Sequence, residues 1–241
     1  MEPLFVLVHS PSVGPSTWTG VAERLAAAGH AVRVPSLLDV GRGEPPFWPR
    51  AAAAVREGVA DVPEDRPLVL VAHSNAGLFV PVVRAALPHR VAASVFVDAA
   101  LPARNGTTPV AGPELLDFLR PLAVDGVLPR WTDWWDEADV APMFTDAATR
   151  RTIVEEQPRL PLSYYEQAVP VPPGWDDHPC AYVLFGPPYE PEAEEARARG
   201  WRVAHLPGEH LHQTVDPAAT AELITSLVSD SRTGSGSAGT G

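Results

Sequence analysis

The sequence contains no lysine, and all 18 of its basic residues are arginine. This absence excludes mechanisms that depend on a lysine amine, such as Schiff-base formation with a carbonyl substrate. Acidic residues number 30, which gives a formal net charge of −12. Because a strongly negative chain repels the phosphate backbone, we expect no nucleic-acid partner.

Cysteine is almost absent as well. Cys180 stands alone, so no internal disulfide can form and a reducing compartment fits. No apolar run approaches the ~20 residues that span a membrane, and no basic segment leads an apolar one at the amino end, as in a signal peptide. We therefore expect a cytoplasmic protein with no membrane partner. Phosphate loops, dinucleotide fingerprints and metal-spaced clusters are also missing, so we expect no cofactor and no metal.

Apolar, strand-like runs alternate with helical stretches along most of the chain. The expected strands are 4–8, 31–34, 68–72, 92–97, 180–185 and 201–206, and the expected helices are 17–28, 48–59, 77–87, 190–199 and 217–228. Such alternation indicates βαβ units. The predicted class is therefore α/β, with a mainly parallel sheet flanked by helices.

The alternation breaks between residues 101 and 178. No strand-like run is visible there, and proline, tryptophan and short amphipathic helices dominate. We interpret 101–178 as a helical cap inserted into a core formed by 1–100 and 179–229. Residues 230–241 consist mostly of serine, glycine and threonine, and we expect them to form a disordered tail.

Ser74 follows a buried strand directly and precedes a helical stretch. Small residues lie two positions before it and two positions after it, Ala72 and Ala76. This is the form of a nucleophile elbow, a turn so tight that larger flanking side chains would collide. The usual glycines are both alanine, which is a relaxed match to G-x-S-x-G. The pattern predicts Ser74 as a nucleophile.

A serine hydroxyl needs a base to accept its proton, and the base needs an acid to orient it. Of the eight histidines, His210 and His212 lie between the last strand and the last helix, at the carboxyl edge of the sheet. We favour His210, which follows Pro-Gly-Glu directly. A His-x-His metal pair is the alternative, but no nearby carboxylate or cysteine cluster supports it.

Two carboxylates are candidates for the acid, and both come between serine and histidine in the chain. Asp98 ends the strand Ser94-Val-Phe-Val97, and a carboxylate buried in that position needs a partner. Glu190 follows strand 180–185, but at a helix start its charge also suits the helix dipole. We favour Asp98 and keep Glu190 as the alternative.

Three stretches of the sequence resemble a known superfamily: 6–18 with its His9-Ser10 strand end, the elbow through Val97-Asp-Ala-Ala-Leu-Pro102, and Gly208-Glu-His210 with the following helix. They are similar to the α/β-hydrolases, in particular to the branch of plant hydroxynitrile lyases and methyl esterases and their bacterial relatives. The resemblance implies an α/β-hydrolase fold, Ser74 as nucleophile, His210 as base and the Asn75 N–H as one oxyanion donor.

The chain departs from that family at two positions. The family usually places its acid in the loop near Tyr189, where this sequence has no aspartate, and this again favours Asp98. The family's other oxyanion N–H belongs to the residue that is Pro11 here, and proline has no N–H. We expect the Ser12 N–H or the Ser10 hydroxyl to compensate, unless the reaction needs less oxyanion stabilisation than ester hydrolysis.

The predicted cap is rich in aromatic residues, and we expect Trp131, Trp135, Phe144 and Tyr164 to line an apolar pocket above Ser74. The expected function is a serine hydrolase that cleaves a carboxylic ester, thioester or lactone of a medium-sized apolar small molecule through an acyl-enzyme. The alternatives are a lyase or cyclase of natural-product biosynthesis and a non-catalytic small-molecule receptor. We expect a monomer or a homodimer.

Overall fold

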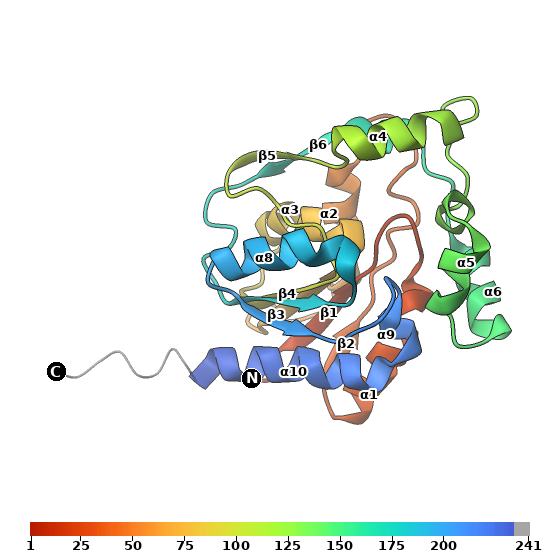
Figure 1. Ribbon diagram of the computed structural model, residues 1–241. Helices are drawn as coiled ribbons and strands as arrows, with labels where there is room; N and C mark the ends of the chain where they lie inside the picture. Colours follow the sequence, from red (N-terminus) through yellow and green to blue (C-terminus); the bar gives the residue numbers. More distant parts are fainter. Residues whose placement is uncertain (234–241) are drawn as a thin grey trace.

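The structure is a computed structural model that describes residues 1–233 of the chain, with side chains described for residues 1–229 (Figure 1). The last helix, α10 (Pro217–Thr233), continues four residues into the stretch 230–241 for which the sequence predicts disorder. The remainder of that stretch, 234–241, lies outside the described residues.

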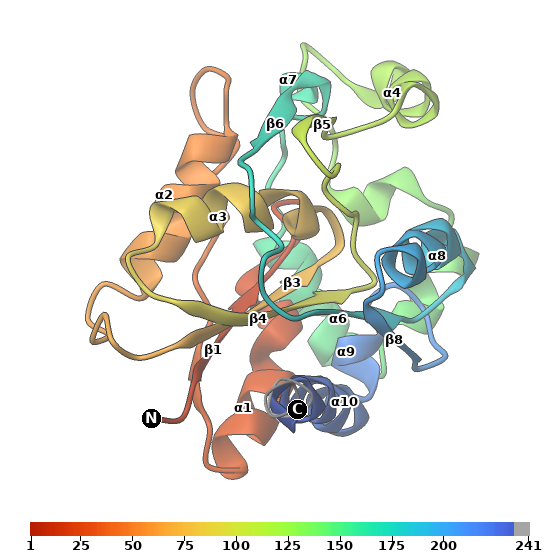
Figure 2. The ribbon, with the colours of Figure 1, turned by 90° about the vertical axis from the view of Figure 1, so that its left-hand side faces the viewer.

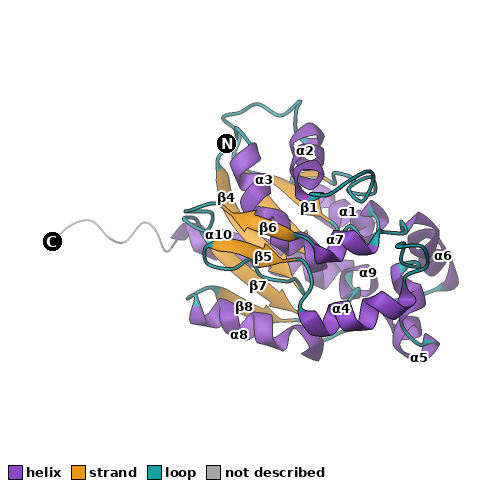
Figure 3. Cartoon of the chain, turned by 90° about the horizontal axis from the view of Figure 1, so that it is seen from above, coloured by secondary structure: helices purple, strands orange, loops and turns teal. Residues whose placement is uncertain are grey.

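Six strands form one sheet through the centre of the molecule (Figure 3). They are β1 (Leu4–Val8), β2 (Ala31–Arg33), β3 (Leu68–His73), β4 (Val91–Val97), β7 (Cys180–Leu184) and β8 (Arg202–His205). Their order is β2-β1-β3-β4-β7-β8, and every neighbouring pair is parallel. The prediction of an α/β fold with a mainly parallel sheet is therefore confirmed.

The strand order places a topological switch point between β1 and β3. The chain passes from β1 outward to β2, then returns to the other side of β1 and continues through β3, β4, β7 and β8. The loops that follow β1 and β3 therefore leave the same edge of the sheet in opposite directions. In open parallel sheets, ligands bind at the carboxyl ends of the strands at such a point.

Helices cover both faces of the sheet because successive strand residues point to opposite sides (Figure 2). Phe5 and Leu7 of β1 pack with α1 (Thr19–Ala27) and α10. Leu4 and Val6 belong to the other core, which contains α2 (Trp48–Gly58), α3 (Val80–Ala86) and α8 (Glu190–Ala198). Burial on both faces explains why these strands are continuous apolar runs rather than alternating ones.

The segment between β4 and β7 lies along the upper and right-hand sides of the molecule in Figure 1. It contains the helices α4 (Pro113–Leu119), α5 (Glu137–Val140), α6 (Ala147–Glu156) and α7 (Leu162–Glu166). It also contains an antiparallel pair, β5 (Gly106–Pro109) and β6 (Ala168–Val171). The expectation of no strand in this segment was wrong, because both strands are only four residues long, each includes a proline, and β5 is mostly exposed.

No helix among the residues that the structure describes combines the length and the apolarity needed to cross a membrane.

Candidate active site

Ser74 lies at the sharp turn between β3 and the 3-10 helix Ser74–Phe79, at the carboxyl edge of the sheet. Its φ angle is +57°, in the left-handed region that non-glycine residues rarely adopt. The flanking Ala72 and Ala76 are fully buried. Gly77 is required here, because a Cβ atom at this position would collide with the carbonyl oxygen of Ala100. The turn has the geometry that the sequence predicts for an elbow.

A continuous hydrogen-bonded chain runs from Ser74 through His210 to Asp98. The Ser74 Oγ lies 2.9 Å from His210 Nε2, and His210 Nδ1 lies 2.7 Å from Asp98 Oδ2. A carboxylate can only accept, so Nδ1 carries the proton and Nε2 is left to accept the serine proton. The three residues come from the loops after β3, β8 and β4, so parallel strands bring them to one edge.

Asp98 is almost completely buried, with 1% of its surface exposed. Its other oxygen, Oδ1, accepts hydrogen bonds from the backbone N–H groups of Phe185 at 2.9 Å and Gly186 at 3.4 Å. Both oxygens of the buried carboxylate are thus satisfied, as its burial requires. The loop after β7, where the family resemblance places the acid, instead supplies N–H donors to Asp98.

Glu190 is the first residue of α8, where its side chain is exposed. No hydrogen bond joins it to His210 within the described part of the chain. The acid nearest to the imidazole is therefore Asp98.

Three aromatic rings surround the His210 imidazole. Tyr189 stacks on it with centroids 4.8 Å apart and an interplanar angle of 2°, and the Tyr189 hydroxyl lies 3.5 Å from Ser74 Oγ. His73 packs at 4.7 Å and Trp131 at 5.7 Å. Burial raises the pKa of Tyr189, so its hydroxyl stays protonated. The imidazole is therefore confined on more than one side while its two nitrogens keep their partners.

His73 supports the loop that carries His210. Its Nε2–H donates to the His210 carbonyl oxygen at 2.8 Å, which fixes the loop that carries the imidazole. Burial, followed by the proximity of His210, lowers the pKa of His73 well below the usual value. A neutral His73 can lie against a His210 that takes up a proton without adding a second positive charge.

The candidate oxyanion donors lie in two neighbouring loops. Asn75 is the second residue of its 3-10 helix, and the first N–H groups of a helix have no intrahelical partner. In the loop after β1, the Ser12 N–H points to Ser10 Oγ at 3.3 Å, and Ser12 Oγ lies 2.6 Å from the Tyr165 hydroxyl. Ser12 and Asn75 line the pocket above Ser74, whereas the buried Ser10 does not.

A cavity of about 1010 Å³ opens above Ser74 and His210. Its aromatic lining includes Trp131 and Trp135, as the sequence predicts, together with Trp134, Tyr165 and Tyr189.

Two of the predicted pocket residues, Phe144 and Tyr164, do not line the cavity. Tyr164 is fully buried between Phe47 and Phe79, and its hydroxyl donates to Asn75 Oδ1 at 2.5 Å. Phe144 packs beside Met143 in a small separate cluster. The expectation that these two line the pocket was wrong, because aromatic composition does not tell which way a side chain of a short helix or of an extended residue such as Phe144 points.

Trp134, Tyr165 and Tyr189 also line the pocket, although no sequence pattern singles them out as pocket residues. Adjacent residues of a helix point about 100° apart, so only one of Tyr164 and Tyr165 can face the pocket. The sequence offered no signal for that choice. For Tyr189, the family resemblance indicates only that the acid usually lies nearby.

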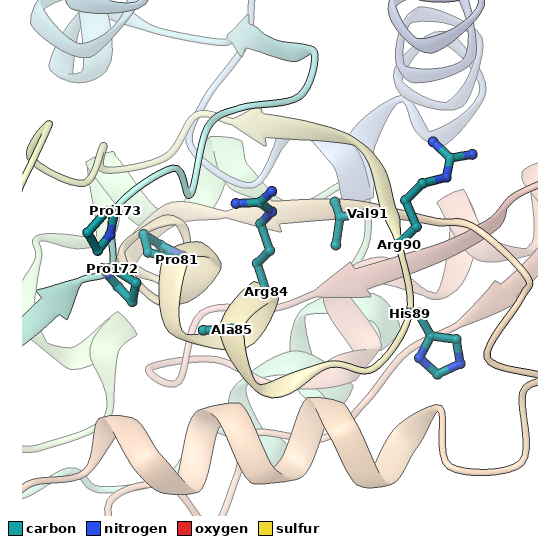
Figure 4. A pocket seen from close by; sticks show the side chains of 8 residues that line it. All are labelled: Pro81, Arg84, Ala85, His89, Arg90, Val91, Pro172 and Pro173. Atoms are coloured by element: carbon teal, nitrogen blue, oxygen red, sulfur yellow. The ribbon is translucent and has the colours of Figure 1, made fainter.

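A second, smaller pocket lies away from Ser74, between α3, the start of β4 and the loop after β6 (Figure 4). It has a volume of about 310 Å³ and is lined by Arg84, His89, Arg90 and three prolines, among others. None of the predicted site residues lies there. Among the described residues, no group of three or more His, Cys, Asp or Glu side chains is arranged to hold a metal ion.

The comparisons with known proteins agree with this architecture. The protein-family model that matches the chain describes the alpha/beta hydrolase family and covers residues 5–223. Esterase PIR7B of Oryza sativa subsp. japonica is 36% identical over 134 residues, which are 52% of this chain and 47% of the rice protein. The chain spans about half the length of the curated relatives that it matches.

Solved structures resemble the fold over nearly its whole length. An extracellular alpha/beta-hydrolase from a Paenibacillus species has a TM-score of 0.71 at 17% identity, covering 93% of this chain and 98% of that one. Methylketone synthase I of tomato has a TM-score of 0.73 at 13% identity, covering 96% of this chain and 98% of its own. At these identities the likeness shows the fold alone.

Proposed function

The chain belongs to the alpha/beta hydrolase family, and we propose that it is a serine hydrolase that cleaves a carboxylic ester, thioester or lactone through an acyl-enzyme. The observation that carries this function is the unbroken hydrogen-bonded chain from Ser74 through His210 to Asp98. The similarity to a rice esterase over half of the chain supports the same reaction class.

In the proposed reaction, Ser74 Oγ attacks the carbonyl carbon while its proton passes to His210 Nε2. The Asp98 carboxylate stabilises the imidazolium that forms, and the Asn75 N–H donates to the carbonyl oxygen as it gains negative charge. When the tetrahedral intermediate collapses, His210 returns the proton to the leaving alcohol or thiol. Water then repeats these steps on the acyl-enzyme and releases the acid.

We propose a medium-sized, mainly apolar substrate, with segment 101–178 acting as the cap over the pocket. Leu115, Trp131, Trp134 and Met143 from this segment line the cavity above Ser74. The acidic residues on the cavity wall are Asp139, Glu192, Glu195 and Glu209. Of these, Glu195 forms ion pairs with Arg104 and Arg199. A wall of this charge disfavours anionic substrates, such as esters that carry a free carboxylate or a phosphate.

A fluorophosphonate probe tests the nucleophile, because it reacts with an activated serine and forms a stable adduct. We expect one adduct per chain at Ser74, and none in Ser74→Ala or after blocking the pocket with substrate. A panel of p-nitrophenyl esters of increasing acyl length then measures kcat/KM, with the maximum expected at medium length. A folded protein whose Ser74 takes no adduct would contradict the proposal.

A second candidate is a non-hydrolytic reaction at the same site, such as a lyase or cyclase step of natural-product biosynthesis. Pro11 favours it, because the loop after β1 has no N–H where the family has an oxyanion donor. Product analysis by mass spectrometry in H₂¹⁸O separates the two: hydrolysis incorporates ¹⁸O into the product acid, whereas a lyase or cyclase step does not.

We propose the cytoplasm as the place of the reaction and a monomer or homodimer as the working form. Cys180 is a free, buried cysteine, and burial raises the pKa of its thiol to about 12, so it remains an unreactive thiol. A chain without a disulfide suits a reducing compartment.

A further inference from the structure

We propose that the Tyr165 hydroxyl, held by Ser12, donates the second hydrogen bond to the oxyanion in place of the backbone N–H that Pro11 lacks. This inference rests on the proposed serine-hydrolase function, and it adds a catalytic residue to that function. It identifies an oxyanion site made from one backbone N–H and one phenol.

The loop after β1 lacks suitable backbone donors at the positions that face the pocket. Pro11 carries no N–H, and the Ser12 N–H is directed to Ser10 Oγ at 3.3 Å. Ser10 itself is buried and does not line the cavity. A single donor, the Asn75 N–H, would leave the developing negative charge incompletely stabilised.

A pair of hydroxyl groups lines the cavity that Ser74 also lines. Ser12 Oγ and the Tyr165 hydroxyl are 2.6 Å apart, and both residues line the same cavity as Ser74, Asn75 and His210. The pair holds two hydroxyl protons, and its mutual hydrogen bond uses one of them. Within the described part of the chain neither hydroxyl makes another hydrogen bond, so one O–H remains to be donated to a bound group.

Chemistry assigns that free proton to Tyr165 rather than to Ser12. A phenol is a stronger acid than an aliphatic alcohol and is therefore the stronger donor to an anion. When Ser12 donates to the phenol oxygen, it polarises the phenol O–H further. Burial raises the pKa of Tyr165, so the phenol keeps its proton at any pH at which His210 works as a base.

The phenol is also held in a fixed position, as an oxyanion donor must be. Tyr165 is 3% exposed, and its ring meets Trp134 at 5.5 Å and Tyr164 at 4.9 Å, both edge to face. Tyr164 in turn donates to Asn75 Oδ1 at 2.5 Å, and Asn75 Nδ2 donates to the Val110 carbonyl oxygen at 3.2 Å. Two consecutive tyrosines of α7 thus support the two donors: Tyr165 supplies one, and Tyr164 holds the residue that supplies the other.

The direct test is Tyr165→Phe, which removes one oxygen and keeps the ring packing. With an activated ester in the wild-type chain as reference, we expect kcat to fall about 10²-fold with KM nearly unchanged, because the lost bond forms only as charge develops. Affinity for a trifluoromethyl ketone of matched chain length, which binds serine as a tetrahedral anion, should fall by a similar factor. Thr220→Val removes a buried hydroxyl from α10 on the far side of the sheet, and we expect it to leave kcat and KM unchanged.

Ser12→Ala distinguishes the contribution of the Ser12 hydroxyl from that of the Tyr165 hydroxyl. We expect a smaller loss than in Tyr165→Phe, and no further loss when both substitutions are combined, because Ser12 acts through Tyr165. A larger loss in Ser12→Ala would overturn the assignment to Tyr165. The oxyanion role would be overturned if Tyr165→Phe is as active as the wild type. It would also be overturned if the substitution raises KM and leaves kcat unchanged.

The two proposals fail in distinguishable ways. If the wild-type chain takes no fluorophosphonate at Ser74 and turns over no ester, the serine-hydrolase function is wrong and this inference with it. If the wild type is labelled and active but Tyr165→Phe keeps its kcat and its ketone affinity, only this inference is wrong. A melting temperature close to the wild-type value shows that Tyr165→Phe is folded.

Discussion

The ring of Tyr189 lies parallel to the imidazole of His210, with an angle of 2° between the planes and 4.8 Å between the centroids. In the proposed mechanism this imidazole becomes positively charged during each proton transfer. The electron-rich face of a tyrosine attracts such a charge, which is worth about 0.5–2 kcal/mol depending on desolvation. Tyr189 therefore both restricts the orientation of the ring and stabilises its protonated form.

Two substitutions at position 189 measure separately the contributions of the Tyr189 ring and of its hydroxyl to catalysis. Tyr189→Phe keeps the stack and removes a hydroxyl that lies 3.5 Å from Ser74 Oγ, at the limit of hydrogen-bond distance, so we expect kcat/KM to fall less than about fivefold. Tyr189→Leu removes the aromatic face, and we expect a loss of about tenfold. Steady-state kinetics with one activated ester measures both. The opposite ranking would assign the effect to the hydroxyl.

Asp98→Asn tests the acid. Asparagine keeps one oxygen for the N–H groups of Phe185 and Gly186, so the fold should survive. Its NH₂ group would face His210 Nδ1 and force the proton onto Nε2, which is the wrong tautomer for a base. We expect kcat to fall about 10⁴-fold, as in proteases with the same arrangement.

Glu190→Gln is the matched control for that experiment. Glu190 is an exposed residue at the start of α8, so its charge reaches the imidazole only as a solvent-screened field. We expect a change in kcat of less than about twofold. A large loss in Glu190→Gln together with a small one in Asp98→Asn would move the acid to the loop after β7.

The charge of the pocket predicts a preference among substrates. Glu192 lines the cavity together with Asp139, Glu195 and Glu209, and one of its oxygens is buried without a hydrogen-bond partner among the described residues. Two like charges about 4 Å apart repel by ~1 kcal/mol in water, and by more where water is excluded. We expect a neutral ester to be hydrolysed at least about fivefold faster than a hemisuccinate ester of the same length.

Glu192→Gln should reduce that preference, and so should high salt. The measurement is kcat/KM for the neutral and the anionic ester in the wild type and in Glu192→Gln, and the ratio of the two values is compared between the proteins. Equal rates for the neutral and the anionic ester in the wild type would show that the carboxylates do not act on the bound substrate.

Much of the fold and part of the candidate site can be predicted from the sequence because of how parallel strands are buried. Strands buried on both faces must be continuous apolar runs, and their carboxyl ends share one edge, so residues that follow different strands can be predicted to meet. Ser74, Asp98 and His210 each follow such a strand directly or through a short loop, and the structure brings them together. Their catalytic roles remain predictions.

The rest of the site depends on packing that local sequence does not encode. Which of Tyr164 and Tyr165 faces the cavity is set by the rotation of the five-residue helix α7 against Phe47 and Phe79. The stack of Tyr189 on His210 depends on a short 3-10 turn, Pro187–Tyr189, and on a loop more than twenty residues later. The strands β5 and β6 pair with each other, and Val169 and Val171 of β6 are also buried in the core.

Buried histidines predict how stability depends on pH. His9 is fully buried, its Nδ1–H donates to the Ser10 carbonyl oxygen at 2.8 Å, and its Nε2 accepts from the Leu37 N–H at 2.8 Å. A second proton on the imidazole would go to Nε2. The resulting Nε2–H would then face the Leu37 N–H, and the hydrogen bond between them would be lost. Burial accordingly lowers the pKa of His9 from 6.5 to about 4.

The direction of the effect follows from proton counting. Between about pH 6.5 and pH 4 the unfolded chain protonates this histidine and the folded chain does not, so acidification favours unfolding in that window. The cost reaches about 1.4 kcal/mol per pH unit for one such group, and it is absent above pH 6.5. His73, whose pKa is also lowered by burial, acts in the same direction.

Urea unfolding at pH 7, 6 and 5 should therefore show a free energy of unfolding that falls progressively more steeply. His9→Gln should show a shallower fall over the same range. A wild-type stability that is constant from pH 7 to pH 5 would contradict the view that these histidines are held neutral in the fold.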